Sequence, residues 1–536
     1  MIPFAYIVLA VLGLDLAFAA YLFAGWLYPV AAIPLIVGIV FFLLRRRRQR
    51  SLPSVQGWPL GPALDLSGEY ETTNVDNAVL SYKAINLGIL AIGGPGSGKT
   101  ESIALSFFSA MPTALPGSGL AFFEGKGDID IYKKAVASGR APDHFFSTEL
   151  PGSESINLMD GEPSDVEDRL TRLLIGQTAT TSFYSDAQRA VLKFMIPILM
   201  GCGKPVVLRD LYVALTVPEA QAELKMLARD NNVDPTILSL YESWTEIKLD
   251  ARRAELSGLL NKLMEFCVGH VADRINAYQP DITVREVIEQ NRFIYFHLPL
   301  SETARSVAVA IVEMFGVEAR RRQLSGPEQY KMFPMLMDDW GAFFHDNFGP
   351  ISARCRSALM PLIFSFQSLA QIKSVSENFA RELDDNLATK IILRVNGEDT
   401  ARFAINLLGE HQELSVGMSE LGDRDGASTG LSQQARVNSR DLRELLPGEC
   451  YVSTVMQRDG KMLNPLWKLR IPRAPYTDEA LAQVEMPPVR EHPEGQGIGL
   501  WRRYMDPSAL QDFEIPVDDE SEPDADWETP RRVVEL

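Results

Sequence analysis

The sequence predicts an α/β fold in which a parallel sheet carries helices on both faces and an all-helical domain is inserted between its strands. Three observations support this prediction. Residues 93–100 read GGPGSGKT and lie between an apolar strand-like run and a helix-like run. Strand-like runs then alternate with helical segments along most of the chain, which is typical of parallel sheets. Between 163 and 277 the periodicity is almost entirely helical, which indicates the insertion.

The first 50 residues predict a membrane anchor of two helices. Residues 1–44 contain one charged side chain, Asp15, which either makes a polar contact between helices or is tolerated near a bend. Residues 3–23 are long enough to span a bilayer, which takes about 20 residues, and residues 26–44 form a second candidate. The run RRRRQR follows at 45–50. By the positive-inside rule this run stays in the cytoplasm, so the rest of the chain is predicted to be cytoplasmic.

Residues 93–100 match G-x-x-x-x-G-K-[ST], the phosphate-binding loop. The glycines let backbone N–H groups curl around phosphate oxygens, and the dipole of the following helix adds partial positive charge. Lys99 is placed to reach the β- and γ-phosphates, and Thr100 to set its hydroxyl on Mg²⁺. We therefore expect ATP and Mg²⁺ as the bound species. The predicted cofactor-binding residues are Gly93, Gly94, Pro95, Gly96, Ser97, Gly98, Lys99, Thr100 and Glu101.

The run FPMLMDD at 333–339 predicts the second half of the nucleotide site. It has the form of an apolar strand that ends in acidic residues. Asp338 is placed to coordinate Mg²⁺, directly or through water, and Asp339 to orient or deprotonate the attacking water. Gln367 ends the next strand-like run, where it either senses the γ-phosphate or simply caps the strand. Lys99, Asp338, Asp339 and Gln367 are therefore the predicted catalytic residues of this chain.

Five segments are predicted along the chain. They are the hairpin with its basic flank (1–50), the first part of the nucleotide-binding domain (51–162), the all-helical insertion (163–277), the second part of the nucleotide-binding domain (278–475) and a disordered acidic tail (476–536). The Pro- and Gly-rich stretch 51–70 is expected to be a linker, and 422–430 a flexible polar stretch. The net charge of −18 argues against a globally basic nucleic-acid coat protein but not against a locally basic channel.

These motifs, in their order, resemble the type IV secretion coupling proteins, the TraD/TraG-like conjugation ATPases. The resemblance covers roughly residues 1–475. It rests on the hairpin, GGPGSGKT, FFEGKGD (122–128), the helical insertion, MLMDDWGAF (335–343), FSFQSLAQI (364–372) and TKIILRVNGEDTA (389–401). The chain departs from the family pattern where Glu124-Gly125 replaces Asp-Pro, where Asp339 replaces Glu, and in its short periplasmic turn.

The resemblance implies a RecA-like motor domain, a helical domain at the cytoplasmic entrance and a homo-hexameric ring around a channel in the bacterial inner membrane. It implies an ATPase that delivers relaxase-bound single-stranded DNA to a type IV secretion channel. In such rings an arginine from a neighbouring subunit stabilises the transferring phosphate. The candidates are Arg394, Arg354 and Arg356, and Arg394 joins the predicted catalytic residues. Lys126, Arg252 and Arg253 are candidates for lining a DNA path.

Two other functions stay open at this point. The chain could be a coupling ATPase that exports protein effectors, or a membrane-anchored docking receptor in which nucleotide binding, without turnover, drives assembly. The acidic tail suits a basic partner such as a relaxosome accessory protein, although a solubilising terminus has the same composition.

Overall fold

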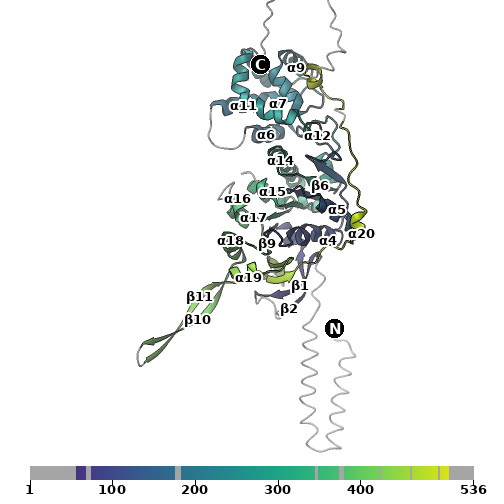
Figure 1. Cartoon of the computed structure of the whole chain (residues 1–536). Helices are drawn as coiled ribbons and strands as arrows, with labels where there is room; N and C mark the ends of the chain where they lie inside the picture. Colours follow the sequence, from purple (N-terminus) through teal and green to yellow (C-terminus); the bar gives the residue numbers. More distant parts are fainter. Residues whose placement is uncertain are drawn as a thin grey trace, which may run out of the picture. The chain divides into compact units, whose positions relative to one another are not determined.

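The computed structural model describes residues 56–67, 74–175, 183–343, 348–373, 379–421, 424–458, 461–492 and 495–505. Contacts divide the chain into two units, Met1–Gln56 and Gly57–Leu536, and the second holds every helix and strand described below (Figure 1). Among the described residues, no helix is both long enough and apolar enough for a membrane crossing. The predicted hairpin at 1–50 and the acidic part of the tail beyond 505 lie outside them.

An 11-stranded mixed sheet organises the second unit, in the order β2-β1-β15-β12-β9-β3-β8-β7-β4-β6-β5. The run from β9 to β5 is parallel, and the four remaining strands extend it antiparallel. The strands are β1 (Gly57–Asp65), β2 (Asn74–Ser81), β3 (Ile89–Ile92), β4 (Leu120–Glu124), β5 (His144–Ser147), β6 (Phe293–His297), β7 (Met335–Asp338), β8 (Leu362–Phe366), β9 (Thr389–Ile392), β12 (Glu449–Ser453) and β15 (Leu466–Arg470). The predicted parallel sheet is confirmed, whereas its antiparallel edge was not predicted.

The parallel strands are buried on both faces because each is a nearly continuous apolar run. All residues of β3, β4, β6 and β8 are buried. Along β4, Phe122 belongs to the hydrophobic core on one face and Phe123 to the core on the other, as the alternation of side chains along a strand requires.

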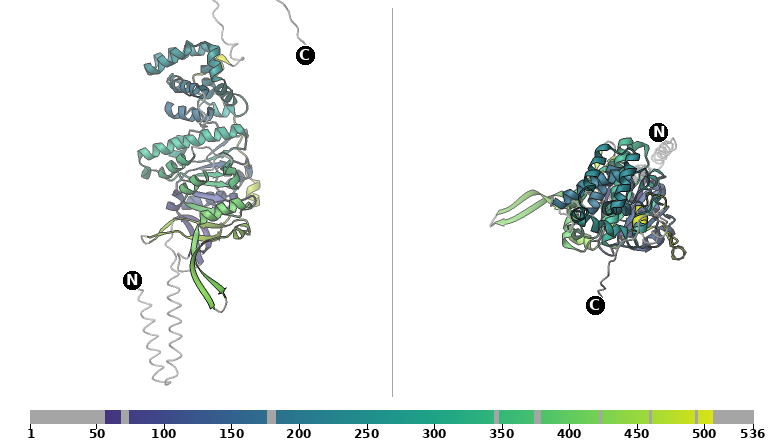
Figure 2. Two further views of the ribbon diagram at one scale, coloured as in Figure 1. Left: turned by 90° about the vertical axis from the view of Figure 1, so that its left-hand side faces the viewer. Right: turned by 90° about the horizontal axis from the view of Figure 1, so that it is seen from above.

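Helices cover both faces of the sheet (Figure 2). A π-helical turn, η1 (Thr100–Leu105), leads from the phosphate loop into α4 (Ser106–Ala114). The other elements around the sheet are α3 (Tyr82–Asn86), α5 (Ile129–Ala137), α14 (Glu302–Ser325), η2 (Pro327–Gln329), η3 (Trp340–Ala342), α15 (Phe348–Ser357), α16 (Leu369–Lys373), α17 (Phe379–Asn386), α18 (Glu398–Leu408), α19 (Ser439–Arg443) and the small hairpin of β13 (Met456–Arg458) and β14 (Lys461–Leu463).

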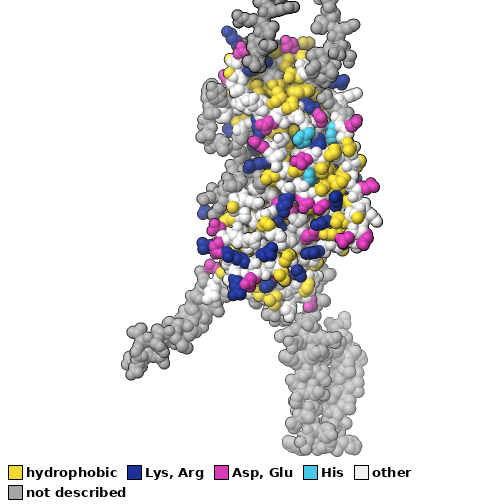
Figure 3. Space-filling view, viewed as in Figure 1, with side chains coloured by type: hydrophobic (Ala, Val, Ile, Leu, Met, Phe, Trp, Pro, Cys, Tyr) yellow, Lys and Arg dark blue, Asp and Glu magenta, His cyan; other side chains and the backbone are white. Residues whose placement is uncertain are grey.

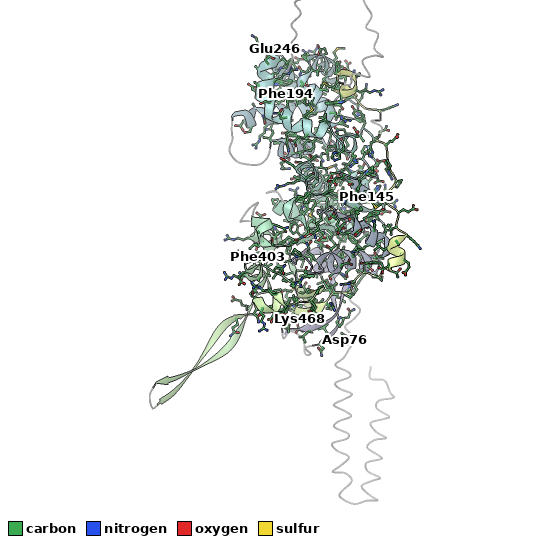
Figure 4. The ribbon with its side chains drawn as sticks, in the orientation of Figure 1. Asp76, Phe145, Phe194, Glu246, Phe403 and Lys468 are labelled. Atoms are coloured by element: carbon green, nitrogen blue, oxygen red, sulfur yellow. The ribbon has the colours of Figure 1, made fainter. Side chains whose placement is uncertain are left out.

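The described chain between β5 and β6 forms helices and no further named strand. These helices are α6 (Pro163–Leu174), α7 (Phe183–Met200), α8 (Leu208–Thr216), α9 (Pro218–Asp230), α10 (Pro235–Thr245), α11 (Leu249–Cys267), α12 (Ala272–Ile275) and α13 (Val284–Glu289). Phe194, labelled in Figure 4, packs within this bundle against Trp244 at a ring-centroid distance of 5.8 Å. An all-helical stretch at this place in the chain is what the sequence predicts.

The prediction of a linker at 51–70 is wrong for the strand β1. Trp58 and Leu60 alternate with exposed neighbours along it and are fully buried. The ladder with β2 shifts register between Pro59 and Gly61 and again between Gly61 and Ala63. These irregularities accommodate the Pro and Gly residues that make the segment resemble a linker.

The prediction of a flexible stretch at 422–430 is also wrong where the structure describes it. Strands β10 (Glu410–Leu421) and β11 (Arg424–Ala435) form an antiparallel hairpin, paired from Glu410↔Ala435 to Leu421↔Arg424. The hairpin projects from the body of the unit near α18 and α19 (Figure 1). Its many Ser and Gly residues suggest a loop, but a regular backbone ladder is formed.

The predicted disorder from residue 476 is wrong as far as residue 505. We call the described part of 471–505 the C-terminal strap; it runs along the side of the unit from β15 to the helical insertion (Figure 1). It contains α20 (Asp478–Ala482) and α21 (Leu500–Tyr504). The buried carboxylate of Asp210 accepts hydrogen bonds from the backbone N–H of Leu500 (2.9 Å) and from the hydroxyl of Tyr278 (2.9 Å). Packing on the insertion therefore orders a segment whose composition resembles a disordered tail.

Candidate nucleotide site

The phosphate loop leaves β3 at the carboxyl edge of the parallel strands, the edge at which α/β sheets bind ligands. Its backbone is held on both sides, because Gly93 N donates to Phe366 O (3.2 Å) and Gly94 N donates to Arg394 O (2.8 Å). Gly98 has a φ of +82°, and a Cβ there would lie 2.9 Å from the backbone nitrogen of Gly448. A residue with a side chain would therefore distort the loop at this position.

The loop and strand β7 are joined through their side chains. The ammonium group of Lys99 contacts the carboxylate of Asp339 and lies 3.6 Å from Oδ1 of Asp338. The Thr100 hydroxyl donates to Oδ2 of Asp338 at 2.8 Å. Ser365, at the end of β8, donates to Oδ1 of Asp338 at 2.5 Å. The predicted residues of the two motifs thus meet in one buried cluster.

The residues present fit a nucleotide phosphate with Mg²⁺. Among the described residues, the buried hydroxyl of Ser97 in the phosphate loop has no hydrogen-bond partner, which is an arrangement that a phosphate oxygen would satisfy. Thr100 and Asp338 supply the oxygen donors that Mg²⁺ prefers. No group of three or more metal-ligating side chains is found in the described part of the chain. Mg²⁺ binds through one or two carboxylates plus phosphates and water, and Asp338 supplies one such carboxylate.

Asp339 sits directly after β7 in a left-handed conformation, with φ 52° and ψ 35°. Such a conformation is uncommon for a residue with a side chain and tends to occur at functional sites. Its Oδ2 accepts hydrogen bonds from Gln367 Nε2 (2.9 Å) and Lys126 Nζ (2.7 Å). Burial alone would raise the pKa of Asp339, but Lys99, Lys126 and Gln367 together lower it below its usual value. Asp339 is therefore held as a carboxylate.

The loop after β4 contributes Lys126 to this cluster, a placement that sequence reasoning missed. The Glu124 carboxylate accepts the backbone N–H groups of Lys126 (2.7 Å), Gly127 (2.7 Å) and Asp128 (3.1 Å). Burial raises the pKa of Glu124 to about 7, against the effect of these hydrogen bonds. The register pairs Glu124 with Asp338 on the neighbouring strand. The available signal was the acidic end of β4 itself, which matches the acidic end of β7.

Glu101, the last of the predicted cofactor-binding residues, directs its carboxylate to other partners. It accepts hydrogen bonds from Lys134 Nζ of α5 (2.6 Å) and from the Tyr476 hydroxyl of the C-terminal strap (3.2 Å). Glu101 therefore joins the helix after the phosphate loop to α5 and to the strap.

The three candidate arginines lie in different places. Arg394 donates to the carbonyl oxygens of Gly96 (3.2 Å) and Pro95 (3.5 Å), in the phosphate loop of its own chain. Arg354 and Arg356 lie in the last turn of α15. Action of any of them on a neighbouring subunit stays a prediction.

The structure contradicts a DNA-lining role for Arg252. This side chain is buried in the helical insertion, where it donates to Gln221 Oε1 (2.8 Å) and stacks 4.4 Å from the centre of the Trp244 ring. Arg253 is exposed and donates to Thr216 O at 3.2 Å. The sequence of α11 does not indicate which of the two arginines is buried, because tertiary packing sets the burial of Arg252.

Figure 3 shows Lys and Arg gathered on the lower part of one face, toward α18 and α19. Ion pairs partly neutralise this area. Arg402 and Arg443 both pair with Glu398, and Arg440 pairs with Glu444.

Comparisons with known proteins agree with the resemblance found in the sequence. Residues 336–449 match the family model described as the TraM recognition site of TraD and TraG. The type 4 coupling protein DotL of Legionella pneumophila is 21% identical over 440 residues, which cover 68% of this chain and 55% of DotL. The chain thus spans about half the length of this relative. The resemblance to type IV secretion coupling proteins is confirmed.

Solved structures of the plasmid coupling protein TrwB share the fold. The unbound form of this bacterial conjugative coupling protein aligns with a TM-score of 0.52 at 14% identity, over 81% of this chain and 92% of that one. TrwB in complex with ADP and Mg²⁺ aligns with a TM-score of 0.52 at 16% identity, over 76% and 90%. At this identity the likeness shows the fold alone, an α/β fold with a mixed central sheet.

Proposed function

We propose that this chain is an ATPase of the type IV coupling class, which couples ATP hydrolysis to delivery of single-stranded DNA, or a relaxase–DNA complex, into a secretion channel. One observation carries the proposal. Lys99 and Thr100 of the phosphate loop meet Asp338 and Asp339 in a single buried cluster. A nucleotide site shared by the two motifs requires this contact between a phosphate loop and two carboxylates at a strand end.

Each residue of the cluster has a defined task in this chemistry. Lys99 would bind the β- and γ-phosphates, and Thr100 with Asp338 would hold Mg²⁺, which would supply neutralisation of the charge that develops on the phosphate oxygens. Asp339, held by the Gln367 amide, orients the attacking water. Ser365 keeps the carboxylate of Asp338 turned toward Thr100, since it donates to the other oxygen of that carboxylate.

The finer features of the proposal come from the family resemblance. They are the two-helix anchor at 1–50 in the inner membrane, a homo-hexameric ring with a trans-acting arginine, and recognition of a relaxosome accessory protein. Support for DNA as the cargo comes from the descriptions of the similar proteins. One matching region is described as a TraM recognition site, and TrwB is a conjugative coupling protein.

The decisive experiment compares ATP turnover and transfer in Lys99→Ala and in Lys133→Ala, a control on α5 whose side chain pairs with Asp130 at 3.8 Å. Full-length protein is assayed alone, with single-stranded DNA and with a protein substrate, and the same variants are tested for conjugative transfer. We expect Lys99→Ala to lose turnover and transfer, and the control to keep both. Normal transfer by Lys99→Ala would refute a motor, and stimulation by protein substrates alone would point to effector export.

A second candidate, a docking receptor that binds nucleotide without turning it over, is favoured by the two lysines on Asp339. A carboxylate with a lowered pKa is a weak general base. If Asp339→Asn kept transfer while Lys99→Ala abolished it, binding rather than hydrolysis would be the essential step.

A further inference from the structure

The backbone around Lys126 is built to hold its side chain at the nucleotide site. Hydrogen bonds to the Glu124 carboxylate fix the turn that follows β4. Gly125 N donates to Asp338 O at 3.3 Å, which ties the turn to the strand that carries the aspartates. A Cβ at position 125 would lie 2.8 Å from the Phe343 ring, so the close approach of the turn to β7 depends on glycine.

The Asp339 carboxylate has one lysine on each oxygen. Lys99 contacts Oδ1, and Lys126 Nζ lies 2.7 Å from Oδ2. The two lysines differ in burial, because the Lys99 side chain is 4% exposed and that of Lys126 is 47% exposed. Burial lowers the pKa of Lys126, but the hydrogen bond to Asp339 and the nearby carboxylates more than reverse this and raise it. Lys126 is therefore charged and approaches Asp339 from the open side.

Lys99 has two partners to serve when a nucleotide binds. Its ammonium must turn to the phosphates. In the structure, however, the same ammonium neutralises Asp339, whose side chain is only 5% exposed. A buried carboxylate that loses its cation is strongly destabilised unless another cation is present. Gln367 also donates to Asp339, but its amide carries no charge.

We propose that Lys126 is a positioning residue that remains as the counter-cation of Asp339 when Lys99 turns to the phosphates. This inference rests on the proposed nucleotide binding and names a residue that lets it occur. Lys126 lowers the penalty for releasing Lys99, and it keeps the Asp339 side chain in place to orient water. Its charge is thereby committed to the nucleotide site, which replaces the DNA-lining role expected from the sequence.

The test measures equilibrium binding of a non-hydrolysable ATP analogue to the full-length protein in detergent. We expect Lys126→Met to weaken binding by about tenfold, because release of Lys99 then leaves Asp339 without a cation. Lys126→Arg, which keeps the charge, should bind within about threefold of the parent. Lys133→Met, a matched change of an α5 lysine paired only with Asp130 in the described ion pairs, should bind as the parent does.

A second comparison separates this role from a merely structural one. In an Asp339→Asn background no buried charge needs a cation, so Lys126→Met should cause no further loss of affinity. Equal binding by Lys126→Met and the parent would overturn the proposal, as would an undiminished loss in the Asp339→Asn background. Either result, in a parent that binds the analogue, leaves the proposed function standing. A parent that binds the analogue but does not hydrolyse ATP contradicts the motor function, while the affinities still decide the role of Lys126.

Discussion

Replacement of Arg252 by alanine should destabilise the helical insertion and leave nucleotide binding intact. The guanidinium donates to Gln221 Oε1 at 2.8 Å and stacks on Trp244 at 4.4 Å, with 4% of the residue exposed. Loss of the donor leaves a buried oxygen unsatisfied, at about 1–3 kcal/mol. A desolvated cation–π contact adds about 2 kcal/mol. We expect a total loss of about 3 kcal/mol in the free energy of local opening.

Hydrogen exchange of the amides in α10 and α11 measures this local opening in the full-length chain. A loss of about 3 kcal/mol corresponds to exchange about a hundredfold faster in these helices. Arg253→Ala is the matched control, since Arg253 is exposed and donates a hydrogen bond to Thr216 O. It should change exchange by less than about fivefold, in line with an exposed contact. Unchanged exchange in Arg252→Ala, with an equal fall of DNA-stimulated turnover in both variants, would refute the structural role of Arg252.

Three further predictions concern the nucleotide site and the strap. Thr100→Ala removes the hydroxyl bonded to Asp338 and should raise the Mg²⁺ concentration needed for half-maximal ATP turnover about tenfold, while Thr100→Ser should leave it unchanged. Equal Mg²⁺ titrations of the parent and Thr100→Ala would contradict the assignment of Thr100 to Mg²⁺. The folded-state pKa of Asp210 is raised from 3.8 to about 6, chiefly by burial, so its stabilising contribution is full below pH 3.8 and is lost as the pH rises through 6. Urea unfolding should therefore show Asp210→Asn gaining about 3 kcal/mol relative to the parent between pH 4 and pH 7, and a flat difference would be evidence against this. Gly497→Ala would place a Cβ 2.1 Å from the Tyr278 ring and should expose the strap to limited proteolysis without change in nucleotide affinity; a resistant strap would show that the ring can move.

The parts of the fold that were predicted correctly are those whose sequence pattern within one segment matches the place of that segment in the folded protein. The sequence predicts a strand-like run that ends at Gln367, and β8 (Leu362–Phe366), a run of five apolar or small residues buried on both faces, ends one residue before it. The phosphate loop is likewise local, because eight consecutive residues define it. Both signals are contained within one segment of the chain and need no knowledge of its neighbours.

Strand β1 and the strap were missed because long-range pairing overrides their composition. The Pro and Gly residues of β1 are those of a linker, and its pairing with β15 could not be foreseen from either segment alone. In the strap, the backbone N–H of Leu500 donates to the carboxylate of Asp210, which lies far earlier in the chain. Composition describes what a segment does in isolation, whereas these two segments are ordered by what they contact.

The candidate site shows the same difference between residues that a local motif identifies and residues that long-range contacts bring in. Lys99, Thr100, Asp338 and Asp339 were predicted as site residues and the structure brings them together. Lys126 was assigned elsewhere because its role depends on β4 lying beside β7, although strands β5 and β6 and the whole insertion separate the two in sequence. Only the strand order reveals that the ends of β4 and β7 lie side by side at one edge of the sheet.

The pairing of β1 with β15 also sets the order of events during synthesis. Ala63 pairs with Leu469, about 400 residues later in the chain, and a ribosome that adds about 5–20 residues per second takes about 20–80 s to cover that distance. Until β15 has been synthesised, the edge of β1 that pairs with β15 in the folded structure has no partner strand. An open edge is a template for pairing with other chains. The nascent protein is therefore open to edge-to-edge pairing at β1 until β15 emerges and covers that edge.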